Sequence, residues 1–269
     1  MTESLIFLHL GKTAGMTLAS IIRRQYPENR LYKVYSDPAM AAVDRFAALP
    51  EDERAYYRAI IGHMHLGMHK LIPGPSTYIT VLRDPVERVI SAYYYVLERP
   101  THPDHAKIRQ SGLDFAGVLD SGLLPILDNS QVQVLCTTDV PDIPYGGCTS
   151  DMLEEAKRNI DRRFAVVGLT ERFDETLLMM KDRFGWKNVY YARRNPTRRR
   201  PRRQDLSAEV LELVRAHNRL DIELYAYARE RFEQEVDRLG VRFRRRVRAF
   251  RRANVAANLY RRFRAQLHA

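Results

Sequence analysis

Short apolar-rich runs that end at a glycine, or just before a glycine or charged residue, recur along the chain and limit how it can fold. The runs are Leu5–Leu10, Tyr56–Gly62, Thr77–Leu82 and Phe164–Val167, and each is typical of a buried strand. Segments with apolar residues at helical spacing lie between them. Strands that alternate with helices indicate an α/β fold with a largely parallel, helix-covered sheet.

Helix boundaries are marked in several places. Asp84 as N-cap and Pro85 at the first helical position predict a helix that runs to about Glu98. The other expected elements are helices over 17–25, 113–121, 129–135 and from 150 or 151 to 162, a helix capped by Thr170, a short strand Val189–Tyr191, and one long helix from Ser207 to about Leu239.

Polar loops follow three of the predicted strands, at Gly11–Thr17, Gly62–His65 and Arg83–Asp84. In open parallel sheets, ligands bind at the carboxyl ends of the strands. We therefore expect these three loops to share one ligand-binding rim.

The chain length bounds the domain organisation. At 269 residues it suits one large domain with an appendage, which we place at residues 1–239 and 240–269.

No apolar stretch approaches the ~20 residues that span a bilayer, and Leu5–Leu10 is too short for a signal peptide. Cys136 and Cys148 suggest reduced thiols rather than a disulfide framework. These features predict a soluble cytoplasmic protein.

The formal net charge of +11 comes from two segments and not from the body of the chain. Residues 193–203 hold seven Arg and residues 241–269 hold ten, with no acidic residue in either. Without these seventeen, 27 basic residues face 33 acidic ones, so the rest of the chain is near −6. This distribution argues against a broad nucleic-acid-binding face.

The second basic segment has apolar residues at three- and four-residue spacings among its arginines. They are Phe243, Val247, Phe250, Ala257, Tyr260, Phe263 and Leu267. The pattern describes a basic amphipathic helix, which suits peripheral contact with the anionic inner face of a membrane or docking to a partner. Packing of the same stripe on the body of the protein is the alternative.

The loop Gly11–Thr17 lies between a strand and a helix, where backbone N–H groups favour an anion. In the nucleoside-triphosphate loop GxxxxGK[ST], the Lys comes at the end. Here Lys12 comes at the start, five residues before Thr17, and no acidic metal partner is obvious after a strand. An ordinary strand–helix connection with a solvated Lys is the alternative.

Arg83 and Ser91 lie on either side of a helix start, eight positions apart. A guanidinium can donate two parallel hydrogen bonds to a terminal phosphate, and the Ser91 hydroxyl can add a neutral one. The alternative is that Arg83 pairs with Asp84 or Glu87 while Ser91 only packs.

His63 stands directly after Gly62 at a strand end, where a general base belongs. An imidazole with an ordinary pKa of about 6.5 accepts a hydroxyl proton at neutral pH. His63, His65 and His69 also fit two other interpretations, simple loop residues or an HxHx3H metal site. No Asp, Glu or Cys nearby completes a recognised ligand pattern.

Together these stretches resemble a family, the carbohydrate sulfotransferases that use 3′-phosphoadenosine 5′-phosphosulfate (PAPS). The resemblance is to the heparan sulfate and dermatan sulfate 2-O-sulfotransferases and their bacterial relatives. Their KTxxTS loop is similar to Lys12–Thr17, their Gly-His to Gly62-His63, and their LRDPxERxxSxYYY to Leu82–Tyr95. The resemblance covers roughly residues 4 to 235.

This resemblance implies a P-loop-NTPase-like fold and transfer of a sulfuryl group from PAPS to a hydroxyl of a carbohydrate or glycolipid acceptor, without a metal. The 5′-phosphosulfate would be held by Lys12, Thr13, Ala14, Gly15, Met16 and Thr17, and the 3′-phosphate by Arg83 and Ser91. His63 would take the acceptor proton, and Lys12 would neutralise the leaving phosphate. A late basic loop commonly closes over the 3′-phosphate in this family, which suggests one or two residues of Arg198–Arg203, and we assign Arg198 and Arg199.

Two positions depart from the family pattern. Met16 replaces a small polar residue, and Ile61 stands where heparan sulfate enzymes have a second His, so a uronic-acid acceptor is not implied. The surplus arginines of 193–203 fit an anionic acceptor, and a solvated loop is the alternative. The lack of an anchor suggests a bacterial cytoplasmic member. A P-loop kinase of a small hydroxyl compound and a non-catalytic binder of anionic surfaces are the alternative functions.

Overall fold

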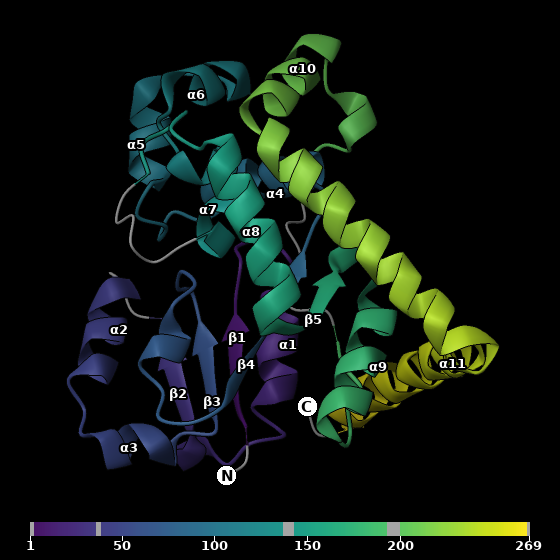
Figure 1. Ribbon diagram of the computed structural model, residues 1–269. Helices are drawn as coiled ribbons and strands as arrows, with labels where there is room; N and C mark the ends of the chain where they lie inside the picture. Colours follow the sequence, from purple (N-terminus) through teal and green to yellow (C-terminus); the bar gives the residue numbers. More distant parts are fainter. Residues whose placement is uncertain (1–2, 36–38, 137–142, 193–199, 268–269) are drawn as a thin grey trace.

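The computed structural model describes residues 3–35, 39–136, 143–192 and 200–267, without the side chains of 39–40 and 261–267. One sheet has the strand order β2-β3-β1-β4-β5, and every neighbouring pair is parallel. Its strands are β1 Ser4–Leu8, β2 Leu31–Val34, β3 Ala59–Gly62, β4 Ser76–Leu82 and β5 Phe164–Leu169. A parallel sheet flanked by helices confirms the expected fold class (Figure 1).

The helices fall between and after these strands. They are α1 Gly15–Ile22, α2 Ala39–Ala47, α3 Glu51–Tyr56, α4 Pro85–Leu97, α5 His105–Ser111, α6 Phe115–Ser121, α7 Ser130–Cys136, α8 Ser150–Arg163, α9 Phe173–Phe184, α10 Ala208–His217 and α11 Arg219–Leu267. Asp84 caps α4 as expected, since its carboxylate accepts a hydrogen bond of 3.0 Å from the backbone N–H of Glu87.

Two hydrophobic cores hold these elements together. The larger one packs the sheet against α1, α8, α9 and α11. The smaller one joins α4, α5, α6 and α10 around Val89, Leu119 and Val214. Figure 1 shows this second group of helices beyond the carboxyl ends of the strands. The rim on which the predicted site residues lie is therefore bordered by a helical layer.

Two short predictions between residues 164 and 192 were wrong. Val189–Tyr191 is not a strand; the backbone N–H of Tyr191 donates to the Asn254 side chain at 2.8 Å, and Val189 is buried. Its apolar run is explained by packing on α11. Thr170 does not cap a helix either, because its hydroxyl donates to the Leu82 carbonyl at 3.0 Å and a 3₁₀ turn, Thr170–Arg172, precedes α9.

The predicted long helix from Ser207 to Leu239 is broken. α10 ends at His217, and Asn218 leaves helical geometry because its buried amide donates to the carbonyls of Leu127 at 2.7 Å and Val214 at 3.0 Å. Sequence patterns also failed to predict β2, α2, α3 and α5, each of which has nine residues or fewer.

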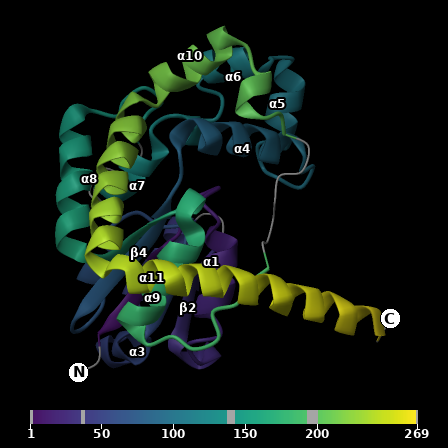
Figure 2. The same cartoon turned by 90° about the vertical axis from the view of Figure 1, so that its right-hand side faces the viewer.

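The C-terminal segment continues α11 beyond a sharp bend at Gly240, whose φ of 70° favours glycine. Phe243, Val247 and Phe250 are buried in the larger core, so this part of the apolar stripe packs on the body. Figure 2 shows the end of α11 extending past the other elements. Across the described residues, no helix has the length and apolarity needed to cross a membrane.

Candidate active site

The loop between β1 and α1 has an unusual backbone. Lys12 and Ala14 have φ values of 69° and 64°, in the left-handed region that non-glycine residues seldom adopt. Left-handed residues in a turn direct neighbouring N–H groups into a concave anion-binding nest. The Thr13 hydroxyl donates to the Leu10 carbonyl at 2.9 Å and braces the loop from inside. The loop before α1 therefore has the left-handed backbone that is typical of an anion-binding nest.

Arg83 is attached directly to this loop. Its Nη1 donates to the Lys12 carbonyl at 3.0 Å, and its Nη2 lies 3.6 Å from the Glu87 carboxylate. The buried Gln131 amide holds the Arg83 backbone, accepting from its N–H at 3.0 Å and donating to its carbonyl at 3.1 Å. Arg83 is thus fixed beside the loop between β1 and α1. It also lies near Glu87, the carboxylate pairing that the sequence offered as the alternative to phosphate binding.

Arg200 brings a second guanidinium to the same place. It donates to the Glu87 carboxylate at 2.8 Å, and Arg203 lies 3.8 Å from Asp84. Arg200 Nη1 is buried, and it has no hydrogen-bond partner within the described part of the chain. The predicted Arg198 and Arg199 lie outside the described residues. Arg200 and Arg203 of the late basic segment therefore both lie beside the Arg83 region, and Arg200 shares the Glu87 carboxylate with Arg83.

Lys12 extends over the Tyr95 ring, with Nζ 3.6 Å from the ring centroid. Burial, followed by the positive charges of Arg83, Arg99 and Arg200, lowers the pKa of Lys12 to about 7, while Glu98 opposes this change. An ammonium ion under such repulsion is stabilised by a bound anion.

The segment between β1 and α1 also holds His63 in one tautomer. Its Nδ1 lies 2.7 Å from the His9 carbonyl, so Nδ1 carries the proton and Nε2 keeps a lone pair. The His63 residue is exposed to solvent. Partial desolvation lowers the pKa of His63, and the hydrogen bond to His9 opposes that change. A neutral imidazole with an accessible Nε2 can act as a general base.

His9 packs against His63, and this contact was not predicted from the sequence. The two rings stack at 4.3 Å between centroids, and His9 Nδ1 lies 3.1 Å from the Tyr35 hydroxyl. Burial lowers the pKa of His9 well below its usual value, so His9 is neutral. Gly15 is required here, because a Cβ at that position would lie 1.9 Å from the His9 ring.

The other predicted residues differ in their exposure and in their hydrogen-bond partners. Thr17 and Ser91 are 2% and 3% exposed, while Met16 is 36% exposed at the start of α1. His65 Nδ1 lies 3.3 Å from the Gln133 carbonyl, and His69 Nδ1 lies 2.9 Å from the Tyr78 hydroxyl. The three histidines of the HxHx3H pattern are thus hydrogen-bonded to three different parts of the fold.

The sequence also did not predict a buried polar network that lies next to Gln131, the residue that holds Arg83. Arg88 is fully buried, lies 3.7 Å from Asp221, and donates to the Ile126 carbonyl at 3.0 Å. The Asp221 carboxylate accepts from the backbone N–H groups of Gln131 at 3.1 Å and Val132 at 2.8 Å. This network joins α4, α7 and α11, and it positions the Gln131 amide that holds Arg83.

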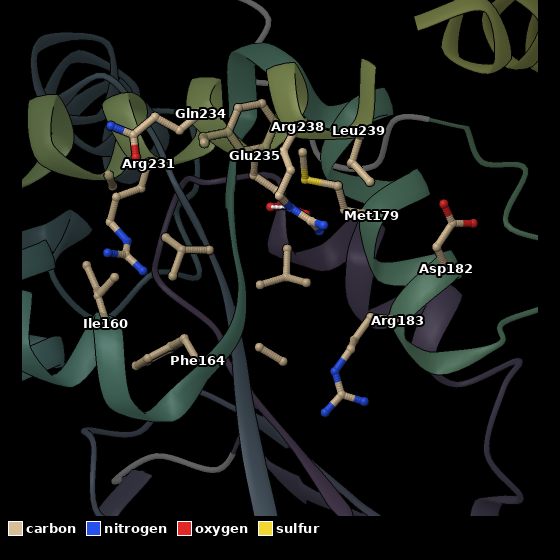
Figure 3. Close-up of a pocket in the computed structure, with 15 residues that line it drawn as sticks. Ile160, Phe164, Met179, Asp182, Arg183, Arg231, Gln234, Glu235, Arg238 and Leu239 are labelled. Atoms are coloured by element: carbon tan, nitrogen blue, oxygen red, sulfur yellow. Dashed lines mark hydrogen bonds and ion pairs between the residues drawn. The ribbon is translucent and has the colours of Figure 1, made fainter. Parts of the chain in front are cut away.

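A separate cavity of about 630 Å³ lies beside the edge strand β5, among α8, α9 and α11 (Figure 3). None of the predicted site residues lines it. Three of its arginines are already paired: Arg183 with Glu3 at 2.8 Å, Arg231 with Asp161 at 2.8 Å and Arg238 with Glu235 at 2.6 Å. The candidate active site is therefore the rim built by Lys12, His63 and Arg83.

Known proteins similar to this chain are sulfotransferases. The model of the galactose-3-O-sulfotransferase family matches residues 142–262. Human galactosylceramide sulfotransferase is 29% identical over 270 residues, which cover 94% of this chain and 62% of that protein. Human heparan-sulfate 6-O-sulfotransferase 1 is 28% identical over 186 residues, which cover 60% of this chain and 44% of that protein. The similarity is thus to carbohydrate sulfotransferases, while the narrower resemblance to 2-O-sulfotransferases stays a prediction.

This chain spans about three fifths of the length of the galactosylceramide sulfotransferases that it matches, 62% for the human protein. Among solved structures, mouse sulfotransferase SULT7A1 complexed with PAP is 12% identical, with a TM-score of 0.39 over 80% of this chain and 63% of that chain.

Proposed function

We propose that this protein is a sulfotransferase that moves a sulfuryl group from PAPS to a hydroxyl of a carbohydrate or glycolipid. The observation that carries the proposal is the attachment of two side chains to one segment. His63 binds the carbonyl of His9 at 2.7 Å, and Arg83 binds the carbonyl of Lys12 at 3.0 Å. A base and a phosphate-binding cation thus flank one anion-binding loop.

The residues present fit a donor with two separate anionic groups. The nest at Lys12–Ala14 suits the 5′-phosphosulfate. Arg83 and Arg200, which share the Glu87 carboxylate, suit the 3′-phosphate. The buried Arg200 Nη1 has no partner in the described part of the chain, so an incoming phosphate oxygen would satisfy it.

In this proposal the donor supplies an electrophilic sulfur attached to a phosphate leaving group. His63 Nε2 takes the proton of the acceptor hydroxyl as the acceptor oxygen bonds to sulfur and the sulfur–oxygen bond to phosphate breaks. Lys12 and the loop N–H groups hold the negative charge that develops on the departing phosphate oxygen. The stack on His9 keeps the His63 ring oriented while it becomes positively charged.

Incubation of the chain with ³⁵S-labelled PAPS and separate panels of galactolipids, glycosaminoglycans and simple galactosides tests the proposal. We expect label in a carbohydrate or glycolipid product in metal-free buffer. Transfer of ³²P from ATP to a small hydroxyl compound, with no ³⁵S transfer, would favour the P-loop kinase. Binding of anionic surfaces without either transfer would favour the non-catalytic alternative.

A bell-shaped pH profile is expected for kcat/KM, because His63 must be neutral and Lys12 must be protonated. The acid limb lies below the ordinary histidine pKa, since desolvation lowers the pKa of His63. The alkaline limb lies near 7, the pKa to which burial and the neighbouring arginines together lower Lys12. Bound donor stabilises the ammonium ion, so the alkaline limb of kcat at saturating PAPS should lie at higher pH. Coincident alkaline limbs for kcat and kcat/KM would contradict this role of Lys12.

We further propose that the end of α11 contacts anionic lipid. Val255, Leu259 and Tyr260 are 60%, 60% and 62% exposed, in a segment that contains arginines and no acidic residue. Leu259→Asp should weaken cosedimentation with phosphatidylglycerol vesicles about tenfold. Val241→Asp, at an equally exposed position beside the Gly240 bend, is the control. Equal binding of wild type and Leu259→Asp would contradict the contact.

A further inference from the structure

Tyr95 forms a platform for two cations. Its ring lies under the Lys12 ammonium, 3.6 Å from ring centroid to Nζ, and under the Arg99 guanidinium at 4.3 Å. Tyr95 is on α4, one helical turn after Ser91, and is half-buried. The partial negative charge of an aromatic face attracts cations, most strongly where water is partly excluded.

The charges around Lys12 explain why such a platform matters. Arg83 and Arg200 approach from the end of β4 and from the late basic segment, and Arg99 from beyond the end of α4. Their repulsion disfavours the protonated form of Lys12, while the carboxylate of Glu98 favours it. A ring stabilises an ammonium ion without adding a formal negative charge, so it does not repel an anionic donor.

We propose that Tyr95 is a positioning residue for Lys12, holding its ammonium ion protonated and directed toward the anion-binding loop. This inference rests on the proposed function, because the anion received is the donor 5′-phosphosulfate. The neighbouring Tyr94 packs on Phe115, with centroids 6.1 Å apart, and has no part in the platform. Two adjacent tyrosines of one motif therefore have separable roles.

The test measures 3′,5′-ADP binding by calorimetry across a pH series, for wild type, Tyr95→Leu, Tyr95→Phe and Tyr94→Leu. Tyr95→Leu should bind about 3- to 30-fold more weakly near neutral pH, the range expected from a cation–π contact. The pH above which affinity falls should shift downward in this variant, because unsupported Lys12 loses its proton more readily. Tyr95→Phe and Tyr94→Leu should keep the wild-type pH dependence.

A purely structural role for Tyr95 would lower affinity without moving the pH dependence, and that result would overturn the proposal. If Tyr95→Leu does not fold, trifluorophenylalanine at position 95 preserves ring shape while weakening its negative face, and the same downward shift is expected. Wild type that fails to bind 3′,5′-ADP would overturn the proposed function itself. If wild type binds 3′,5′-ADP normally and the pH dependence of affinity is unchanged in Tyr95→Leu or in the trifluorophenylalanine variant, only the role of Tyr95 is overturned.

Discussion

His63→Ala is expected to reduce sulfuryl transfer by about 10²- to 10⁴-fold in kcat, the usual contribution of a positioned general base. The reason is geometric. The Nδ1 proton is committed to the His9 carbonyl at 2.7 Å, so Nε2 is the atom left to accept the acceptor proton. Affinity for 3′,5′-ADP should change little, because His63 acts on the acceptor. Steady-state transfer assays and calorimetry together separate the two effects.

His65→Ala is the matched control. Both histidines lie in the loop after β3, but the His65 ring contacts the Gln133 carbonyl at 3.3 Å and not the β1–α1 segment. We expect this variant to stay within a few-fold of wild type. A His63→Ala enzyme that retained more than a tenth of the wild-type kcat, or a His65→Ala enzyme with the larger loss, would contradict the assignment of the base.

Arg88→Met is expected to lower the free energy of unfolding by about 3–5 kcal/mol, the usual cost of removing one partner of a buried ion pair. Arg88 and Asp221 are both fully buried, 3.7 Å apart. Methionine fills much of the volume but leaves the Asp221 carboxylate without its countercharge. Urea unfolding, followed by circular dichroism, measures the loss.

An exposed ion pair provides the control for this effect. Arg158 and Glu155 lie 2.7 Å apart, with side chains 52% and 42% exposed, so Arg158→Met should cost no more than about 1 kcal/mol. The double variant Arg88→Met/Asp221→Leu should recover part of the lost stability, since no unpaired charge remains buried. An Arg88→Met chain as stable as Arg158→Met would show that Arg88 does not support the fold.

Local signals in the sequence were sufficient to predict that the three loops lie on one edge of the sheet. The apolar run before Gly11, the Gly-His after β3 and the Asp84-Pro85 start of α4 each predict their own element, and parallel topology then brings the three loops together. The same reasoning located Lys12, His63 and Arg83 on adjacent strand ends. It could not show that two of their side chains hydrogen-bond to one backbone segment.

The supporting contacts depend on residues far apart in the chain. Gln131 holds Arg83 across 48 positions, and the partners Arg88 and Asp221 are on α4 and α11. No periodicity or spacing within one segment marks such a pair. The motif LRDPxERxxSxYYY contains Arg88 and Tyr95, but its pattern does not reveal that one is buried and the other lies under Lys12. Side-chain partners of this kind require the three-dimensional structure.

Packing also overrode some local patterns. Val189–Tyr191 has the composition of a strand, yet α11 provides the burial that a sheet would have supplied. Asn218 interrupts a segment with helical spacing because its amide is used in the buried network. In both cases, hydrogen bonds and packing with a distant segment outweighed the local preference for a strand or a helix.

Calorimetric titration of the purified chain with 3′,5′-ADP in metal-free buffer, compared with 5′-AMP and with ATP in the presence of Mg²⁺, is the most direct test of the donor site. The account predicts binding of 3′,5′-ADP that is clearly tighter than binding of 5′-AMP and independent of metal. Tight binding of ATP that requires Mg²⁺, with indifference to the 3′-phosphate, would contradict the sulfotransferase proposal and support a kinase.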